Sequence, residues 1–437
     1  MKRTSALAAA FLAAAALAPA QAPARNPALS PLDAALPDLQ KLYLDLHQSP
    51  ELSFHEEKTA AKMAERLKAL GYTVTTGVGG NGVVGVLVNG KGPTVMIRTD
   101  LDALPVEEKT GLAYASKVRT KDDAGNDVAV MHACGHDIHM TSWIGAATLL
   151  AKAKDRWRGT VVLVGQPAEE RVGGAAVMLK DGLYTRFPKP DFAIALHDSS
   201  QLPSGKLRVT EGYAYANVDT VEITIYGRGG HGALPYTTVD PIVIAARTIV
   251  ALQTLVAREN NPFDPAVVTV GSIHGGTRPN IIPDEVKLQL TVRCYKDDVR
   301  KALLAGIERI VKAESAGAGA PKPPQVTVYD SCSSVYNDPA LSKRLTAAFV
   351  KAFGQDNVGE GKPFMVSEDF SEYGRAGVPA VIFELGAVEP ARFEAAQKAG
   401  TRLPSLHSSE WAPDYPVAIR MGVSSLTVAA LDLLGKP

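Results

Sequence analysis

Cysteine is scarce in this sequence. The 437 residues contain only three cysteines, Cys134, Cys294 and Cys332. Three cysteines cannot form the dense disulfide scaffold that stabilises small secreted domains, so the fold must depend on a hydrophobic core. A single bridge between Cys294 and Cys332 stays open, because the sequence does not show the geometry that a disulfide needs.

An excess of charge is also absent. The chain has 46 lysines and arginines against 46 aspartates and glutamates, and no long run of either sign. This balance argues against nucleic acid or an anionic membrane surface as a partner and favours a small neutral or singly charged molecule. A chain of this length exceeds what one hydrophobic core usually organises, so we expect two domains.

Long apolar runs are absent except at the N-terminus. Lys2 and Arg3 precede an apolar run over residues 6–18 that ends in small residues, which predicts a signal peptide at residues 1–20. The run is shorter than the roughly 20 apolar residues of a spanning helix. We expect no later membrane span, and therefore an exported protein, periplasmic or secreted. Prolines across residues 21–37 predict a flexible tether.

Short segments that are apolar on both faces predict the central strands of an α/β sheet. They cover residues 94–97, 160–164, 192–196 and 380–383. An amphipathic helix is expected before them, over residues 57–70.

Polar residues follow three of these predicted strands directly. Asp100 and Asp102 follow the first strand, Glu169 and Glu170 the second, and His197 the third. Ligands of open α/β sheets bind beyond the carboxyl ends of the strands, so we expect one site assembled from these dispersed segments.

Residues 216–329 have a different pattern. Apolar and polar residues alternate strictly at 221–225 and 286–292, and helical patterns cover residues 241–258 and 298–313. The predicted order of strand, helix, two strands, helix and strand is that of a ferredoxin-like α+β module. We interpret residues 216–329 as an inserted domain within a catalytic domain formed by residues 38–215 and 330–437.

The densest group of metal-binding side chains lies at residues 131–139. Cys134 and His136 are close enough in sequence to bind one metal, and sulfur with nitrogen suits zinc, cobalt, nickel or manganese. The alternative is a closed, purely structural zinc site. Such a site usually needs two or more cysteines, and only Cys134 lies nearby, which argues against it. Glu169 and Glu170 are adjacent carboxylates, so one is expected to bind metal while the other faces a reacting water.

Ordered motifs between residues 39 and 433 give the chain a family resemblance. They lie at residues 46–54, 98–105, 131–139, 166–170, 195–197, 229–233, 280–284 and 367–370. With them the chain resembles the aminoacylase and carboxypeptidase family of dinuclear metallohydrolases, in the branch of hippurate hydrolase and the plant indole-acetyl-amino-acid hydrolases. The resemblance implies an α/β, zinc-peptidase-like catalytic domain with a mixed central sheet and an inserted ferredoxin-like lid and dimerisation domain.

The resemblance also implies a metal site. Its metal ligands correspond to Cys134, His136, Glu170, His197 and His407 of this sequence. They would hold two divalent ions, with Zn, Mn, Co and Ni all left open.

The implied reaction is hydrolysis of the amide bond of an N-acyl amino acid by a metal-activated water. Glu169 would be the general base, and His231 of the insert, from the same chain or a partner subunit, would stabilise the oxyanion. Asn280 and Arg293 are candidates for binding the substrate carboxylate. Asp102 is expected to orient His136. The family likeness favours a homodimer or a higher homo-oligomer.

Two other functions remain as alternatives. One is a metallocarboxypeptidase or dipeptidase of the same fold, and the other is a secreted binding protein that has lost catalysis. The binding-protein alternative predicts a missing metal ligand or base. The five implied ligands and Glu169 are all present in the sequence. Trp143 and Tyr236 differ from common family residues, so we expect them to reshape the acyl pocket.

Overall fold

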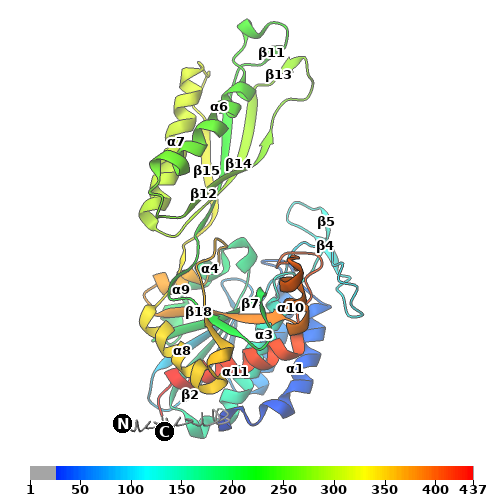
Figure 1. Ribbon diagram of the computed structural model, residues 1–437, viewed down its shortest axis with the longest axis vertical. Helices are drawn as coiled ribbons and strands as arrows, with labels where there is room; N and C mark the ends of the chain where they lie inside the picture. The colour runs from blue at the N-terminus through cyan, green and yellow to red at the C-terminus, as the bar shows by residue number, and fades with distance from the viewer. Residues whose placement is uncertain (1–25, 437) are drawn as a thin grey trace, which may run out of the picture.

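The computed structural model describes residues 26–436, in which a catalytic domain carries an upright inserted domain (Figure 1). The predicted signal peptide, residues 1–20, lies outside the described residues. The catalytic domain is built on an eight-stranded sheet of order β1-β2-β6-β3-β7-β18-β8-β17.

The four predicted central strands are neighbours in this sheet. They are β6 (Gly159–Gln166), β3 (Thr94–Asp100), β7 (Phe192–Pro203) and β18 (Ala380–Val388), and they run parallel to one another. The edges hold β1 (Thr73–Val78), β2 (Gly82–Asn89), β8 (Leu207–Val209) and β17 (Val358–Glu360). Antiparallel pairs at β1–β2, β2–β6 and β18–β8 make the sheet mixed, as the resemblance implied.

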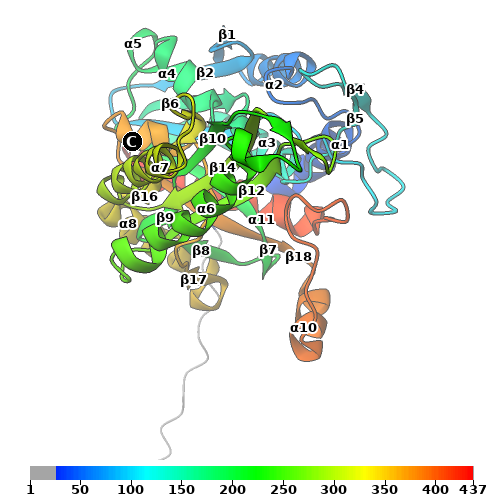
Figure 2. The ribbon, with the colours of Figure 1, turned by 90° about the horizontal axis from the view of Figure 1, so that it is seen from above.

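Helices cover both faces of the sheet (Figures 1 and 2). One face packs against α1 (Leu32–His47), α2 (Glu57–Ala69), α3 (His136–Lys152), α8 (Pro339–Phe353) and α11 (Tyr415–Leu433). The other packs against α4 (Gly174–Lys180), α5 (Leu183–Arg186) and α9 (Ser371–Arg375). In β3, Val95 and Ile97 point to the first layer and Met96 to the second, which explains why the strand is apolar throughout.

The predicted tether is wrong for residues 26–37. Residues Pro27–Leu29 form a 3₁₀ turn, α1 begins at Leu32, and Ala28, Leu32 and Leu36 are buried. Pro31 precedes the first helical residue, where a missing N–H breaks no hydrogen bond, so proline here accompanies a helix start. Residues 21–25 lie outside the described residues.

The inserted domain has its own sheet and core. Its main elements are β10 (Val218–Tyr226), α6 (Pro241–Thr254), β12 (Ala266–His274), β14 (Glu285–Cys294), α7 (Asp297–Gly317) and β15 (Gln325–Cys332). The sheet order β12-β14-β10-β15, antiparallel throughout, is the ferredoxin-like arrangement expected from the sequence. A small pair, β11 (Gly230–His231) and β13 (Ile281–Ile282), lies at the tip farthest from the catalytic domain (Figure 1).

The other elements are short pairs and one peripheral helix. They are β4 (Arg119–Lys121) with β5 (Asp127–Ala129), β9 (Gly212–Tyr215) with β16 (Val335–Asn337), and α10 (Pro390–Ala399). All three cysteines are buried free thiols, so Cys294 and Cys332 are not bridged.

The expectation that no later segment has the length and hydropathy of a membrane span is wrong. Two segments do, Pro241–Glu259 and Tyr415–Leu433. The second is α11, which packs against α3 and is a core helix of the catalytic domain. The first is α6 with the π-helical turn that follows it, and it packs on the sheet of the insert.

Candidate active site

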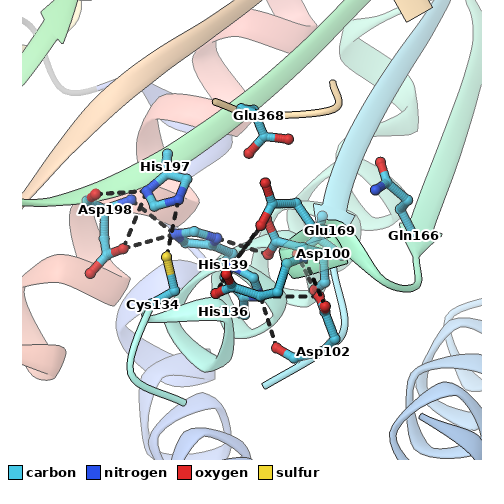
Figure 3. Close-up of polar contacts among 12 residues, drawn as sticks. Asp100, Asp102, Cys134, His136, His139, Gln166, Glu169, His197, Asp198 and Glu368 are labelled. Atoms are coloured by element: carbon cyan, nitrogen blue, oxygen red, sulfur yellow. Dashed lines mark hydrogen bonds and ion pairs between the residues drawn. The ribbon is translucent and has the colours of Figure 1, made fainter. Parts of the chain in front are cut away.

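Polar side chains gather where the central strands end (Figure 3). Asp100 ends β3, Gln166 ends β6, and α3 begins at His136. Before α3, Gly135 has a φ of 73°, and a Cβ there would lie 2.4 Å from an Asp198 carboxylate oxygen. Only glycine therefore permits this approach of the loop to β7.

The five predicted metal ligands lie together. Cys134 Sγ is 3.6 Å from His197 Nε2 and 3.2 Å from His407 Nε2. Glu170 Oε2 is 3.4 Å from His407 Nε2, and Glu170 Oε1 is 3.8 Å from His136 Nε2. Segments separated by up to 273 positions thus bring nitrogen, sulfur and oxygen donors into one group, as the sequence predicted.

The donor atoms fit metal ions. His136 Nδ1 bonds to the Asp102 carbonyl and His197 Nδ1 to the Asp198 carbonyl, both at 2.8 Å. When Nδ1 carries the proton, Nε2 keeps a lone pair for a metal. His136 Nε2 and Glu170 Oε1 are buried and have no hydrogen-bond partner within the described chain, as expected of atoms that bind an ion.

The grouping also fits two ions. Cys134 belongs to one triad with His136 and His197 and to another with Glu170 and His407. Burial, and then the charge of Glu170, raise the pKa of the Cys134 thiol. A bound cation would favour the thiolate again.

Glu169 is adjacent to the ligand group and buried. Its Oε2 lies 3.7 Å from His136 Nε2. Burial first, and then the negative charge of Glu368, raise the pKa of Glu169. Figure 3 shows the Glu368 carboxylate facing Glu169 across the site. A carboxylate with raised proton affinity beside a metal group has the properties of a general base.

Asp102 contacts two of the predicted metal ligands, His136 and Glu170. Its carbonyl orients His136, and its Oδ1 is 3.4 Å from the same ring nitrogen. Its Oδ2 accepts the Ser53 hydroxyl at 2.6 Å and the Glu170 N–H at 3.0 Å. The predicted orientation of His136 thus depends mainly on the Asp102 main chain, while the side chain holds the Glu170 backbone.

His139 belongs to the site although the sequence analysis gave it no role. Its Nδ1 bonds to Asp100 Oδ1 at 2.8 Å, and its Nε2 accepts the Asp198 N–H at 2.8 Å. The sequence could have indicated this position, because His139 lies three residues after His136 at the start of α3, and residues three apart share a helix face.

Arg98 forms a second group that the sequence analysis missed. The guanidinium is fully buried and donates to Asp100 Oδ2 at 2.7 Å, Glu368 Oε1 at 2.8 Å and Gln166 Oε1 at 2.9 Å. A further contact reaches Asp369 at 3.3 Å. Because Glu368 is 270 positions away, no local pattern marks the pair.

The predicted residues of the insert do not join this group within one chain. His231 is in β11, and the N–H of the next residue, Gly232, donates to the Asn280 carbonyl at 2.8 Å, so His231 and Asn280 lie at the tip that carries β11 and β13 (Figure 1). Arg293 is near the other end of the domain, where its Nη1 donates to the Met365 carbonyl at 3.0 Å.

Of the two unusual aromatic residues, Trp143 does not line a pocket. It is fully buried in α3 and donates its indole N–H to the Ile97 carbonyl at 3.0 Å. Its role is packing between helix and sheet, so the expectation for Trp143 is wrong. Tyr236 is exposed on the insert, on the 3₁₀ turn Pro235–Thr237.

Known proteins resemble this chain over most of its length. The family model of peptidase family M20/M25/M40 matches residues 96–400. Thermostable carboxypeptidase 1 of Saccharolobus solfataricus is 35% identical over 396 residues, which are 90% of this chain and 94% of that protein. Hippurate hydrolase of Campylobacter jejuni is 36% identical over 338 residues, 76% of this chain and 84% of that protein.

A solved structure of a family member also resembles this chain over most of its length. A dinuclear metal-binding peptidase of the M20 family from Bacillus subtilis superposes with a TM-score of 0.73 at 28% identity, covering 92% of this chain and 100% of that chain. The fold, the donor group and these relatives together make the protein a metal-dependent amidohydrolase or peptidase that uses a pair of divalent ions. The chain belongs to peptidase family M20/M25/M40.

Proposed function

We propose that this enzyme hydrolyses the amide bond of N-acyl amino acids, hippurate-like compounds among them, with Glu169 as the general base. The observation that carries the proposal is the position of Glu169. Its buried carboxylate adjoins the five donor groups, and in the described part of the chain it is paired with no lysine or arginine. It is therefore free to exchange a proton with a water held in the site.

The mechanism assigns separate tasks to the residues. When bound, the two cations would lower the pKa of a coordinated water and polarise the amide carbonyl. Glu169 would take a proton from that water and deliver it to the leaving amine. The raised pKa of Glu169, caused by burial and by Glu368, suits a group that must hold the proton between the two transfers.

Substrate binding requires the insert. Arg293 and Asn280 are proposed to bind the substrate carboxylate, and His231 to stabilise the oxyanion. His231 and Asn280 lie at the tip of the insert, so we propose that a second copy of the chain supplies them, and that insert motion closes the site.

A dimer through the insert is supported by its exposed apolar residues. Val243 and Val250 on α6 are 55% and 71% exposed, and Ile273 on the edge strand β12 is 50% exposed. An apolar helix face beside an open strand edge is typical of a surface that associates. Sedimentation of Val250→Asp should then give monomers, whereas an unchanged dimer would refute this interface.

Mixing two inactive variants tests the shared site. Glu169→Ala and His231→Ala are each expected to be inactive, because each dimer site needs one residue from each chain. A dissociated and reassociated mixture should regain activity, because mixed dimers contain one intact site. A mixture that stays inactive would contradict supply of His231 by the second copy.

A substrate comparison tests the proposed function itself. The purified enzyme, loaded separately with Zn, Mn, Co or Ni, is assayed with hippurate, N-acetyl amino acids and free dipeptides. We expect kcat/KM to be highest for the acylated amino acids. The likeness to a carboxypeptidase favours the alternative function, and preferential cleavage of dipeptides would establish it instead.

We also propose that the protein is exported, on the basis of the predicted signal peptide at residues 1–20. Cell fractionation with N-terminal sequencing should find a chain that begins at or near Gln21 outside the cytoplasm. A cytoplasmic chain with an intact N-terminus would contradict export.

A further inference from the structure

A buried carboxylate outside the ligand group joins three segments of the catalytic domain. Glu56, just before α2, has no exposed surface. Its Oε1 accepts the N–H groups of Phe54 and Ala168, each at 2.8 Å, and its Oε2 accepts the Asn81 side-chain amide at 3.1 Å. No lysine or arginine among residues 26–436 pairs with it, so these N–H donors compensate the burial of the carboxylate.

The contact with Ala168 matters because of where this residue lies. Residues 168–172, here called the catalytic turn, contain Glu169 and Glu170. The turn begins at Ala168 with a φ of 50° and ends at Val172 with a φ of 47°. Residues with a Cβ rarely adopt this left-handed conformation, and they keep it only where the surroundings hold them.

Two carboxylates hold the backbone of the catalytic turn in place. Glu56 accepts the Ala168 N–H on one side of Glu169, and Asp102 accepts the Glu170 N–H on the other side at 3.0 Å. Asp102 is itself bound by the Ser53 hydroxyl, three residues before Glu56. The segment at 53–56 therefore fixes the backbone of the proposed base from both directions.

We propose that Glu56 is a positioning residue for Glu169, which it serves by holding the Ala168 N–H and with it the strained start of the catalytic turn. The inference rests on the proposed role of Glu169. It requires a hydrogen-bond acceptor at position 56 and does not require a negative charge. This distinction makes Glu56→Gln a conservative test, since the amide oxygen still accepts from Ala168 and Phe54.

Glu51 provides a matched control on the same segment. Its carboxylate accepts the Thr59 N–H at 2.7 Å and the Lys58 N–H at 3.3 Å, and so caps the start of α2 without contacting the catalytic turn. Glu51→Ala removes a helix cap of similar kind, so it reports what a purely structural loss in this segment does.

The kinetic test compares three variants in metal-loaded enzyme with hippurate or another N-acyl amino acid that the wild type hydrolyses. Glu56→Ala should lower kcat about 10- to 100-fold, the usual effect of losing an orienting partner, with KM within about twofold and metal content unchanged. Glu56→Gln should keep kcat within about threefold, as should Glu51→Ala. Equal losses of kcat in Glu56→Gln and Glu56→Ala, or in Glu51→Ala and Glu56→Ala, would overturn the proposal.

A second measurement does not depend on turnover. In metal-free protein, amide hydrogen exchange followed by mass spectrometry should show a peptide covering residues 166–174 exchanging at least about 10-fold faster in Glu56→Ala, but not in Glu51→Ala. Unchanged exchange in Glu56→Ala would refute the proposal. If Glu56→Ala does not fold, Asn81→Ala, which removes one donor to Glu56, should show a smaller change in the same peptide, and no change would count against the proposal.

The two measurements separate the inference from the proposed function. A wild type that hydrolyses no N-acyl amino acid refutes the function, while the exchange data still decide whether Glu56 holds the catalytic turn.

Discussion

Replacing Arg98 by methionine is expected to destabilise the catalytic domain strongly. The guanidinium is fully buried and lies 2.7 Å from Asp100 Oδ2, 2.8 Å from Glu368 Oε1 and 3.3 Å from Asp369 Oδ1. Methionine fills similar volume, so the main cost is the loss of a cation among buried carboxylates. Breaking a buried pair costs about 3–5 kcal/mol, and we expect about 4 kcal/mol here. At about 2–4 °C per kcal/mol, the unfolding midpoint should fall by about 10 °C.

Tryptophan fluorescence isolates the relevant transition. The three tryptophans of the chain, Trp143, Trp157 and Trp411, are all buried in the catalytic domain, so the insert does not contribute to the signal. Thermal unfolding is followed in chelator-treated protein, because bound metal would add its own stabilisation.

The control is Arg119→Met. Arg119 pairs with Asp127 at 2.8 Å on the exposed β4–β5 hairpin, and exposed pairs contribute little to stability. Its midpoint should stay within about 1 °C of the wild type. Equal midpoints for Arg98→Met and the wild type would refute the reasoning, because they would mean that the buried carboxylates need no cation.

Two further predictions concern the metal group and the pH dependence of stability. Cys134→Ala removes the atom common to both ligand triads, so metal affinity measured by competition with a chelator should fall at least about 100-fold, and an unchanged affinity would contradict the shared sulfur. His47 is buried between Asp137, at 2.7 Å, and Glu108, at 3.3 Å, and these hydrogen bonds outweigh burial and raise its pKa to about 10. Because the pKa of His47 is higher in the folded than in the unfolded protein, this stabilisation is complete below pH 6.5 and is lost as pH rises through about 10. Chemical denaturation of metal-free protein should therefore show the free energy of unfolding falling by about 2–4 kcal/mol across this range. The fall should be absent in His47→Gln.

The sequence predicted the central sheet because burial on both faces leaves a local mark. β3, β6, β7 and β18 each contain an apolar run, and polar side chains follow these runs, although β7 continues past its run so that His197 lies within the strand. The family resemblance added His407, which no strand or helix pattern marks. Local chemistry and the ordered motifs were therefore sufficient to select side chains that the fold brings into one group, Glu169 among them.

The interactions between distant segments were not predictable in the same way. Arg98 meets Glu368 across 270 positions, and Glu56 meets Ala168 across 112. Neither contact follows from periodicity, because each depends on which loops the folded sheet brings together. The prediction of a tether was wrong for a related reason. The prolines were given more weight than the apolar spacing of Leu32 and Leu36, whose burial depends on distant partners.

The insert shows the limit of motif reasoning within one chain. His231, Asn280 and Arg293 were all given substrate roles, yet the first two lie at the tip of the domain and Arg293 lies near its other end. The sequence indicates which residue types can bind a carboxylate. Whether these residues reach the metal-binding group depends on domain motion and on assembly with a second chain.

The most direct test of the central claim is the metal content and turnover of Glu169→Ala beside the wild type. Glu169 lies with His136 and Glu170 in a group that could hold an ion, but we propose that it moves protons without binding metal and that five other side chains hold the ions. Elemental analysis should therefore find the same metal content per chain in both proteins, with kcat lower by at least about 100-fold in the variant. Wild-type turnover in Glu169→Ala at equal metal content would contradict the account.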